Sequence, residues 1–298
     1  MALSAQPEPW CISPMPAALP REHSNRSRTG PSPGLPLCVA CGTQYGAARG
    51  DCPLCEDERQ FVPLTGQAWT TLERLCGPSR RGALHAQGPG VLGIGCEPSF
   101  AIGQRALLSQ APGGNVLWDC QAYLDDELVA LIRAEGGVSA IAISHPHFYT
   151  TMVEWAHEFD APVHLHAADR RWVGREDAAL EFWNGDSFAL AEGLTLHRAG
   201  IHFPGGTVLH WSGDPDGGGA LFSGDIINVI PDRTHVSFLY SYPNQIPERP
   251  EVVESAAARL EPLRYDRLYG GWWDRTIPHG ADRIVQESAR RYLAFTRG

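Results

Sequence analysis

From about residue 61 onward, alternating apolar and polar stretches predict a long α/β domain. Apolar runs bounded by glycine-bearing turns predict strands at residues 91–95, 100–103, 106–108 and 116–120. Apolar residues then recur with helical spacing over residues 125–134, which predicts a helix. A short apolar run over residues 138–143 follows and predicts a buried strand.

Two histidines come directly after this buried strand, at His145 and His147. Residues at i and i+2 of an extended backbone point to the same side, so the pair is able to chelate one metal ion through neutral ring nitrogens. A capping-box pattern from Thr151 to Glu154 predicts that the next helix begins near residue 151.

The second half of the chain returns to strands and then to helices. Strands are predicted at residues 162–166, 188–190, 194–198, 206–211, 219–223 and 265–269. Helices are predicted at residues 167–173, 252–260 and 281–295. This order of strands, helices, strands and helices predicts two sheets packed face to face, with helices on the outer faces.

The N-terminal part of the chain differs in composition from the rest. Residues 1–36 are rich in Pro, Ser and Arg and lack apolar periodicity, which predicts a disordered tail. Residues 37–60 contain two Cys-x-x-Cys pairs, formed by Cys38, Cys41, Cys52 and Cys55. Two such pairs close a tetrahedral sulfur site with no open position, and so short a segment depends on the metal for its folding.

We expect a zinc knuckle at these four cysteines. The Cys-Gly and Cys-Pro dipeptides also resemble rubredoxin, and that resemblance would place redox-active iron at the same thiolates. The loop between the two pairs is much shorter than in rubredoxin, which favours zinc. In either case all four metal positions are filled, so we do not expect hydrolysis at this site.

The overall composition narrows the classes of function. The chain has 298 residues, of which 43% are hydrophobic and 19% charged, and its formal net charge is -10. This acidic charge argues against a nucleic-acid partner. No apolar run approaches the roughly 18 residues that a membrane span needs, so we expect no membrane partner. The N-terminus lacks a secretory signal pattern, so we expect a cytoplasmic protein whose unpaired cysteines are reduced.

Three later stretches place further polar side chains at strand ends and turns. His202 lies in a Gly/Pro-rich loop before a strand, and Asp225 follows a glycine at the end of a strand. His279 lies in a turn before the last helix, and the pair Trp272-Trp273 is expected in a wall or a core.

In order and spacing, these motifs resemble the metallo-β-lactamase superfamily over residues 65–298. The family's buttressing aspartate corresponds to Asp119. Its metal ligands correspond, in chain order, to His145, His147, His202, Asp225 and His279. The resemblance implies an α/β fold, the αββα sandwich of metal-dependent hydrolases, with the cysteine module in front of it.

The sequence departs from the family at Tyr149 and Thr150, where the family has an Asp-His pair that serves a second metal ion. Only Asp225 and His279 remain for a second site, so the resemblance implies one metal ion rather than two. The three histidines His145, His147 and His202 with an open position form the pattern of a catalytic zinc.

The roles of the nearby residues remain open at this level. Asp225 is either a fourth ligand or the group that positions the attacking water, and Asp119 is expected to orient a ligand histidine. Tyr149 is a candidate catalytic hydroxyl, with packing beside the next helix as the alternative.

The expected function is hydrolysis of an ester, thioester, lactone or amide in a small molecule, in which the metal polarises the carbonyl and presents hydroxide. Zinc is expected at both sites, with iron as the alternative at either. A second hypothesis is a non-catalytic member of the fold whose cysteine module docks a protein partner. A third is a redox protein in which rubredoxin-like iron feeds electrons to the main domain, as in flavodiiron proteins.

Overall fold

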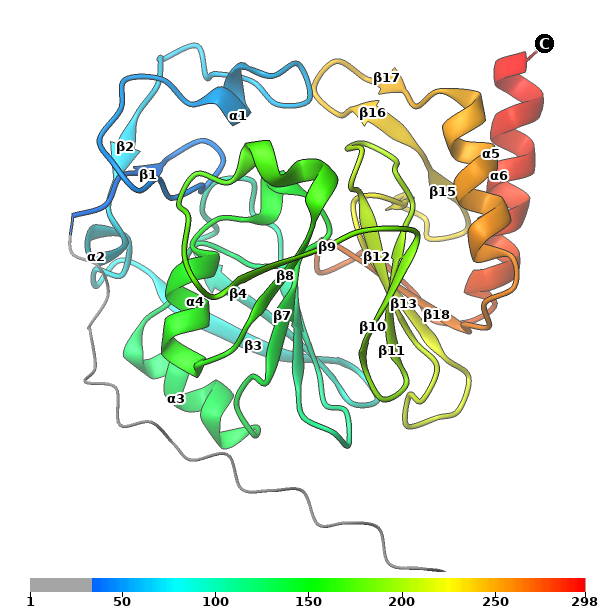
Figure 1. Cartoon of the computed structure of the whole chain (residues 1–298), viewed down its shortest axis with the longest axis horizontal. Helices are drawn as coiled ribbons and strands as arrows, with labels where there is room; N and C mark the ends of the chain where they lie inside the picture. The colour runs from blue at the N-terminus through cyan, green and yellow to red at the C-terminus, as the bar shows by residue number, and fades with distance from the viewer. Residues whose placement is uncertain (1–33, 298) are drawn as a thin grey trace, which may run out of the picture. The chain divides into compact units, whose positions relative to one another are not determined.

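Two mixed β-sheets lie between two pairs of helices in the computed structural model, which describes residues 34–297 (Figure 1). The first sheet has the strand order β3-β4-β5-β6-β7-β8-β9. Its strands are β3 (Arg81–Gly88), β4 (Val91–Glu97), β5 (Ala106–Ser109), β6 (Val116–Trp118), β7 (Ala140–Ala142), β8 (Val163–His166) and β9 (Leu180–Trp183).

The second sheet has the strand order β10-β11-β12-β13-β18-β19. Its strands are β10 (Ser187–Ala191), β11 (Leu194–Arg198), β12 (Thr207–Trp211), β13 (Ala220–Gly224), β18 (Arg267–Gly270) and β19 (Thr276–Ile277). Three short pairs stand apart from the two sheets: β1 (Leu37–Cys38) with β2 (Trp69–Thr70), β14 (Asn228–Val229) with β15 (Val236–Ser237), and β16 (Leu239–Ser241) with β17 (Ile246–Pro247).

The long helices cover the outer faces of the sheets. The helices are α1 (Pro53–Glu56), α2 (Leu72–Leu75), α3 (Asp126–Ala134), α4 (Met152–Phe159), α5 (Pro250–Leu260) and α6 (Ala281–Arg297), with 3-10 turns η1 (Pro146–Phe148) and η2 (Ala167–Trp172). Helices α3 and α4 pack on the first sheet, and α5 and α6 pack on the second (Figure 1).

Alternation along the strands explains why the two sheets stack. Leu117 and Ile141 pack toward the outer helices of the first sheet, whereas their neighbours Trp118 and Ala142 point into the layer between the sheets. Phe222 of the second sheet packs in the same central layer. Successive side chains of a strand point to opposite faces, so each apolar strand contributes to two cores.

Some local predictions from the sequence are wrong. Residues 100–103 form a turn rather than a strand, and the strand β3 lies in a stretch for which the sequence pattern predicted no element. Thr151 occupies the N-cap of α4, but its hydroxyl donates to the carbonyl of Ala122, 3.0 Å away, instead of capping the helix. The predicted capping box is therefore absent from α4.

The cysteine segment packs against the main domain. All of the described residues belong to one compact unit, in which residues 37–60 contact the chain from residue 65 onward. The expected tail over residues 1–36 lies, up to residue 33, outside the described residues.

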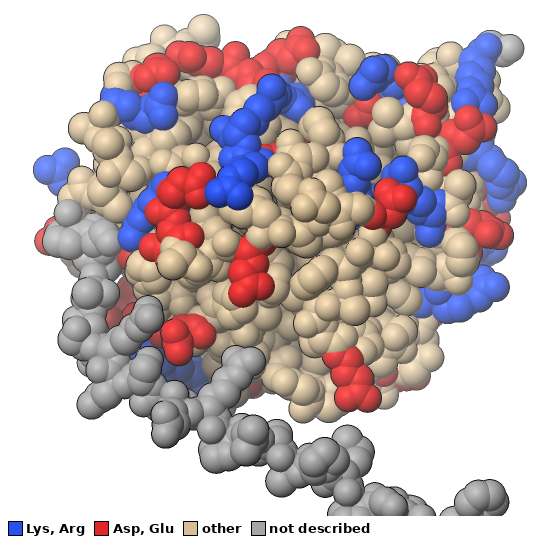
Figure 2. Space-filling view, in the orientation of Figure 1, with Lys and Arg blue, Asp and Glu red and all other residues tan. Residues whose placement is uncertain are grey.

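The surface carries charged side chains of both signs. On the face shown in Figure 2, basic and acidic side chains are interspersed over a largely uncharged surface. Within residues 34–297, no helix has both the length and the apolar character required to cross a lipid bilayer.

Candidate metal centre and pocket

The candidate centre starts at the carboxyl ends of two neighbouring parallel strands, β6 and β7. Asp119 follows β6, and its Oδ1 accepts a hydrogen bond from the backbone N–H of Ser144 at 2.7 Å. The Oγ of Ser144 lies 2.9 Å from Nδ1 of His145. Asp119 therefore acts on His145 through Ser144 and makes no direct hydrogen bond to a histidine ring.

His145 and His147 converge through a turn. His145 has an extended backbone, with φ -169° and ψ 170°, whereas His147 lies within the 3-10 turn η1. Their ring centroids are 5.2 Å apart. The sequence correctly predicts a pair of adjacent imidazoles, but the predicted geometry of alternate positions on one strand is wrong.

His202 reaches the pair from the loop between β11 and β12 and has a left-handed backbone, with φ 65°. Its N–H donates to Oε2 of Glu248 at 2.9 Å, and its Nδ1 lies 2.8 Å from the carbonyl oxygen of Tyr240. A carbonyl only accepts, so Nδ1 carries the hydrogen and Nε2 keeps its lone pair. That Nε2 lies 3.1 Å from Nδ1 of His147.

These three imidazoles are suited to hold a metal ion. Their ligand atoms all lie within 4.8 Å of one another, and all three side chains are buried. Burial lowers the pKa of each ring, to about 3 for His202. The rings are therefore neutral, which is the state in which histidine binds metals. Within the described chain, Nε2 of His145 has no hydrogen-bond partner, as expected of an atom that faces a cation.

Asp225 lies beside this cluster, after the last residue of β13. Its Oδ1 is 3.2 Å from Nε2 of His145, and the hydroxyl of Tyr242 donates to its backbone carbonyl. Burial, with a smaller contribution from the charge of Asp119, raises the pKa of Asp225 to about 8. A buried carboxyl of this kind ionises only when a cation lies close, so Asp225 also suits a metal site.

The approach of the two strand ends requires glycine at position 224. Gly224 has φ +56°, and a Cβ there would lie 2.7 Å from Oγ of Ser144 and 3.0 Å from Oδ2 of Asp119. Any side chain would push these two groups away from His145.

Two candidate residues from the sequence do not reach the cluster. The side chain of His279 is 78% exposed, and its Nδ1 lies 2.8 Å from Oδ2 of Asp266 at the surface. The prediction of His279 as a ligand is therefore wrong for this structure. Tyr149 packs in the core of the first sheet and does not line the pocket described below, a position that agrees with its alternative role in packing.

At Thr150, where the resemblance places a second-metal ligand, the cysteine segment makes contact. The backbone N–H of Gln44 donates to the carbonyl of Thr150 at 3.0 Å. Gln44 Nε2 also lies 3.1 Å from Oε1 of Glu154 in helix α4. In the described part of the chain, the groups with metal-binding geometry are the three histidines and the four cysteines.

The four cysteines form a second candidate metal site. Sγ atoms of Cys38 and Cys55 are 3.6 Å apart, and those of Cys41 and Cys52 are 3.7 Å apart. Zinc–sulfur bonds of 2.3 Å in a tetrahedron give a separation of about 3.8 Å between sulfurs, so the cage fits zinc. Hydrogen bonding from the neighbouring thiols lowers the pKa of Cys38, and Gln67 Nε2 donates to its sulfur at 3.2 Å.

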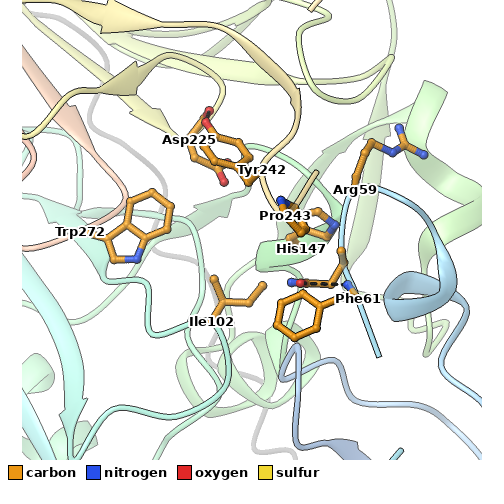
Figure 3. A pocket seen from close by; sticks show the side chains of 9 residues that line it. Arg59, Phe61, Ile102, His147, Asp225, Tyr242, Pro243 and Trp272 are labelled. Carbon is orange, nitrogen blue, oxygen red and sulfur yellow. Dashed lines mark hydrogen bonds between the residues drawn. The ribbon is translucent and has the colours of Figure 1, made fainter. Parts of the chain in front are cut away.

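A pocket of about 280 Å³ opens beside the histidine cluster (Figure 3). His147 and Asp225 form part of its wall, together with Trp272, which the sequence placed in a wall or a core. The remaining lining residues are Arg59, Gln60, Phe61, Ile102, Tyr242 and Pro243. The end of the cysteine segment and Phe61 directly after it therefore supply part of the wall of the pocket.

Sequence reasoning missed Arg59, Phe61 and Tyr242. They come from segments without apolar periodicity and reach the site only through contacts between distant parts of the chain. A weak signal was present in Asp57 and Arg59, an acid and a base at alternate positions directly after the cysteines.

One curated relative and several solved structures are similar to the chain. The "uncharacterized protein YmaE" of Bacillus subtilis (strain 168) is 45% identical over 261 residues, which cover 86% of this chain and 95% of that protein. No family model matches the chain.

The solved structures that are similar to the chain include three crystal structures. The DIM-1 metallo-β-lactamase has a TM-score of 0.52 at 13% identity, and its match covers 71% of this chain and 98% of that one. TMB-1 gives 0.53 at 15% identity with the same coverage, and VMB-1 gives 0.51 at 13% identity over 74% of this chain and 100% of that one. At such identities the likeness concerns the fold, and it confirms the αββα metallo-β-lactamase fold.

Proposed function

Because the chain belongs to the family of the Bacillus subtilis protein YmaE and has the metallo-β-lactamase fold, we propose that it is a metal-dependent hydrolase. Its proposed substrate is a small molecule with an ester, thioester, lactone or amide bond. The observation that carries the proposal is the convergence of three buried imidazoles beside an open pocket, whose wall includes His147.

In this proposal His145, His147 and His202 hold one metal ion, and zinc is the first choice for three imidazole ligands. When bound, such an ion polarises a carbonyl and lowers the pKa of water to about 7. Asp225 lies next to His145 and lines the pocket, so we assign it the orientation of the attacking water and the acceptance of its proton. Tyr242 holds the backbone of Asp225 in place.

A single metal ion at this centre is expected for two reasons. Tyr149 packs in the core, and Thr150 has a hydroxyl where the resemblance has an imidazole, so neither takes the place of the Asp-His pair of the resemblance. His279 is paired with Asp266 at the surface. Asp225 alone is too few ligands for a second tightly held ion.

The test compares His202→Ala with His279→Ala in the full chain. We expect wild-type protein to carry one metal ion at the histidines and one at the cysteines, and to hydrolyse at least one of an ester, a thioester, a lactone and an amide. His202→Ala should lose one metal equivalent and the hydrolysis, whereas His279→Ala should keep both. Retention of both metal equivalents, or of hydrolysis, in His202→Ala would refute the proposal.

A non-catalytic binding protein is the second candidate, and the loss of the Asp-His pair at Tyr149 and Thr150 favours it. This candidate predicts that metal is bound at the histidines while none of the four substrate classes turns over. Elemental analysis of the purified chain also addresses the redox alternative, which requires iron at the four cysteines.

A further inference from the structure

Apolar groups make up most of the wall of the pocket, although Gln60 also lines it. The aromatic rings and aliphatic groups of the wall are those of Phe61, Ile102, Tyr242, Pro243 and Trp272. Figure 3 shows Ile102, Phe61 and Trp272 around the cavity, and Tyr242 next to Asp225. A substrate whose carbonyl reaches the histidines therefore places its neighbouring chain against these apolar groups.

The one arginine among the described lining residues offers no free charge to this space. Nε and Nη2 of Arg59 bind the carboxylate of Asp57 at 2.6 and 2.8 Å, and Nη1 donates to the carbonyl of His202 at 3.2 Å. Its guanidinium also lies over the ring of Phe203, 4.0 Å from the centroid, and Figure 3 shows it directed away from Trp272. The positive charge of Arg59 is thus paired with groups of the protein itself and is not available to a ligand.

The remaining titratable groups of the wall disfavour an anion. Among the lining residues of the described chain, Arg59 is the one Lys or Arg, and Asp225 is an acidic residue. A carboxylate on the part of the substrate remote from the histidines would lose its water without gaining a cationic partner, which is strongly unfavourable.

Apolar side chains continue from the pocket to the surface. The side chain of Phe61 lines the pocket and is 57% exposed, and Val62 and Leu64 after it are 38% and 109% exposed. A longer apolar chain would bury part of this surface as it extends out of the cavity.

We infer that the substrate carries an uncharged, apolar chain next to the bond that is cleaved, and that anionic thioesters and anionic lactams are excluded. This inference rests on the proposed function and names the substrate class of the same site. The volume of about 280 Å³ limits the enclosed part to a short alkyl chain or one ring, since pockets for drug-sized ligands span roughly 300–1,000 Å³.

The test uses ketones, which the protein cannot hydrolyse, so that binding is measured apart from turnover. 2-Heptanone and 6-oxoheptanoate have seven carbons each and differ in the far end, a methyl group in one and a carboxylate in the other. Their dissociation constants are measured by calorimetry on the full, metal-loaded chain. We expect 2-heptanone to bind at least tenfold more tightly than 6-oxoheptanoate. It should bind about fifteenfold more tightly than 2-pentanone, since burial favours each of its two added methylenes about fourfold.

Two variants test where the alkyl chain of the ketone binds. Phe61→Ala should weaken the binding of 2-heptanone about fivefold, because it removes a lining ring. Leu64→Ala, on the same segment but outside the pocket, should leave the dissociation constant unchanged. Equal or tighter binding of 6-oxoheptanoate, or an equal effect of both variants, would overturn the inference.

Ester hydrolysis measured in parallel separates this inference from the proposed function. Hydrolysis of 4-nitrophenyl acetate without selectivity between the two ketones would overturn the inference alone. Selective ketone binding without turnover of any ester, thioester, lactone or amide would overturn the proposed function alone.

Discussion

Arg59 connects the cysteine segment to the histidine centre, and its removal should weaken both. The side chain is only 5% exposed, binds Asp57 with two hydrogen bonds and donates to the carbonyl of His202. We expect Arg59→Ala to lower the free energy of unfolding and the affinity of the histidine site for zinc.

The magnitude follows from the contacts that are lost. An unpaired buried carbonyl at His202 costs about 1–3 kcal/mol, and the lost stacking on Phe203 about 0.5–2 kcal/mol. Asp57 loses its partner but is 19% exposed, so water compensates for part of that loss. These two losses sum to about 1.5–5 kcal/mol, and the upper part of this range is that for breaking a buried ion pair from one side, about 3–5 kcal/mol. Because Arg59 supports a ligand from outside, zinc affinity should fall about 10–100-fold.

Arg170→Ala is the matched control. The guanidinium of Arg170 also lies over an aromatic ring, 4.1 Å from the centroid of Phe182, and it pairs with Glu176 at 3.6 Å. Both partners of that pair are exposed, at 58% and 64%, so its removal should change stability by less than about 1 kcal/mol. Urea denaturation and competition with a zinc-binding dye measure the two quantities. If Arg59→Ala matches Arg170→Ala in both, the link between Arg59 and His202 does not support the site.

Two further predictions concern Gly224 and Asp169. Gly224→Ala should destabilise the protein and weaken zinc binding, because the added Cβ would meet Ser144. Gly217→Ala is the control, since Gly217 has a similar φ of +72° and open space around it. This control should lose only about 1 kcal/mol of stability in the same urea assay. Burial raises the pKa of Asp169 to about 6, so the native state keeps its proton where the unfolded state has released it. Stability should therefore fall as pH rises from about 4 to 6, and Asp169→Asn should remove this share of the dependence and gain up to about 3 kcal/mol above pH 6. An unchanged pH profile in that variant would count against the assignment.

The sequence predicts the ligands of the candidate centre better than its surroundings. His145 and His147, and the two cysteines of each Cys-x-x-Cys pair, lie close together in the sequence and therefore in space, whereas His202 was assigned from the resemblance. The strand β12 follows from its apolar run, because its two faces lie in two cores, and the helix α6 follows from periodicity, because one of its faces lies in a core. The stretch from 225 to 249 has no such periodicity, although it contributes Tyr242 to the pocket and Glu248 to the support of His202.

The wrong prediction of His279 as a ligand also arises from a contact between residues that are distant in sequence. A histidine in a turn before the last helix fits the resemblance in order and spacing, yet the residue that determines its position is Asp266, on a different element. Asp266 also accepts the backbone N–H of Gly280 at 2.7 Å, so it fixes the turn as well as the ring. Partners that are distant in sequence and make only one or two hydrogen bonds leave no pattern along the chain.

The position of the cysteine segment explains how the fold tolerates Tyr149 and Thr150. In the resemblance these positions serve a second metal ion, and under the proposal of a single ion the turn after His147 is held in another way. Here the Thr150 backbone has φ 38°, and its carbonyl accepts the N–H of Gln44 from the loop between the two cysteine pairs. Fifteen residues farther along, Arg59 donates a hydrogen bond to the carbonyl of His202. A cysteine-bound metal would thus stabilise both segments that carry the histidines, and the chain that it orders leads directly to Phe61 in the wall of the pocket.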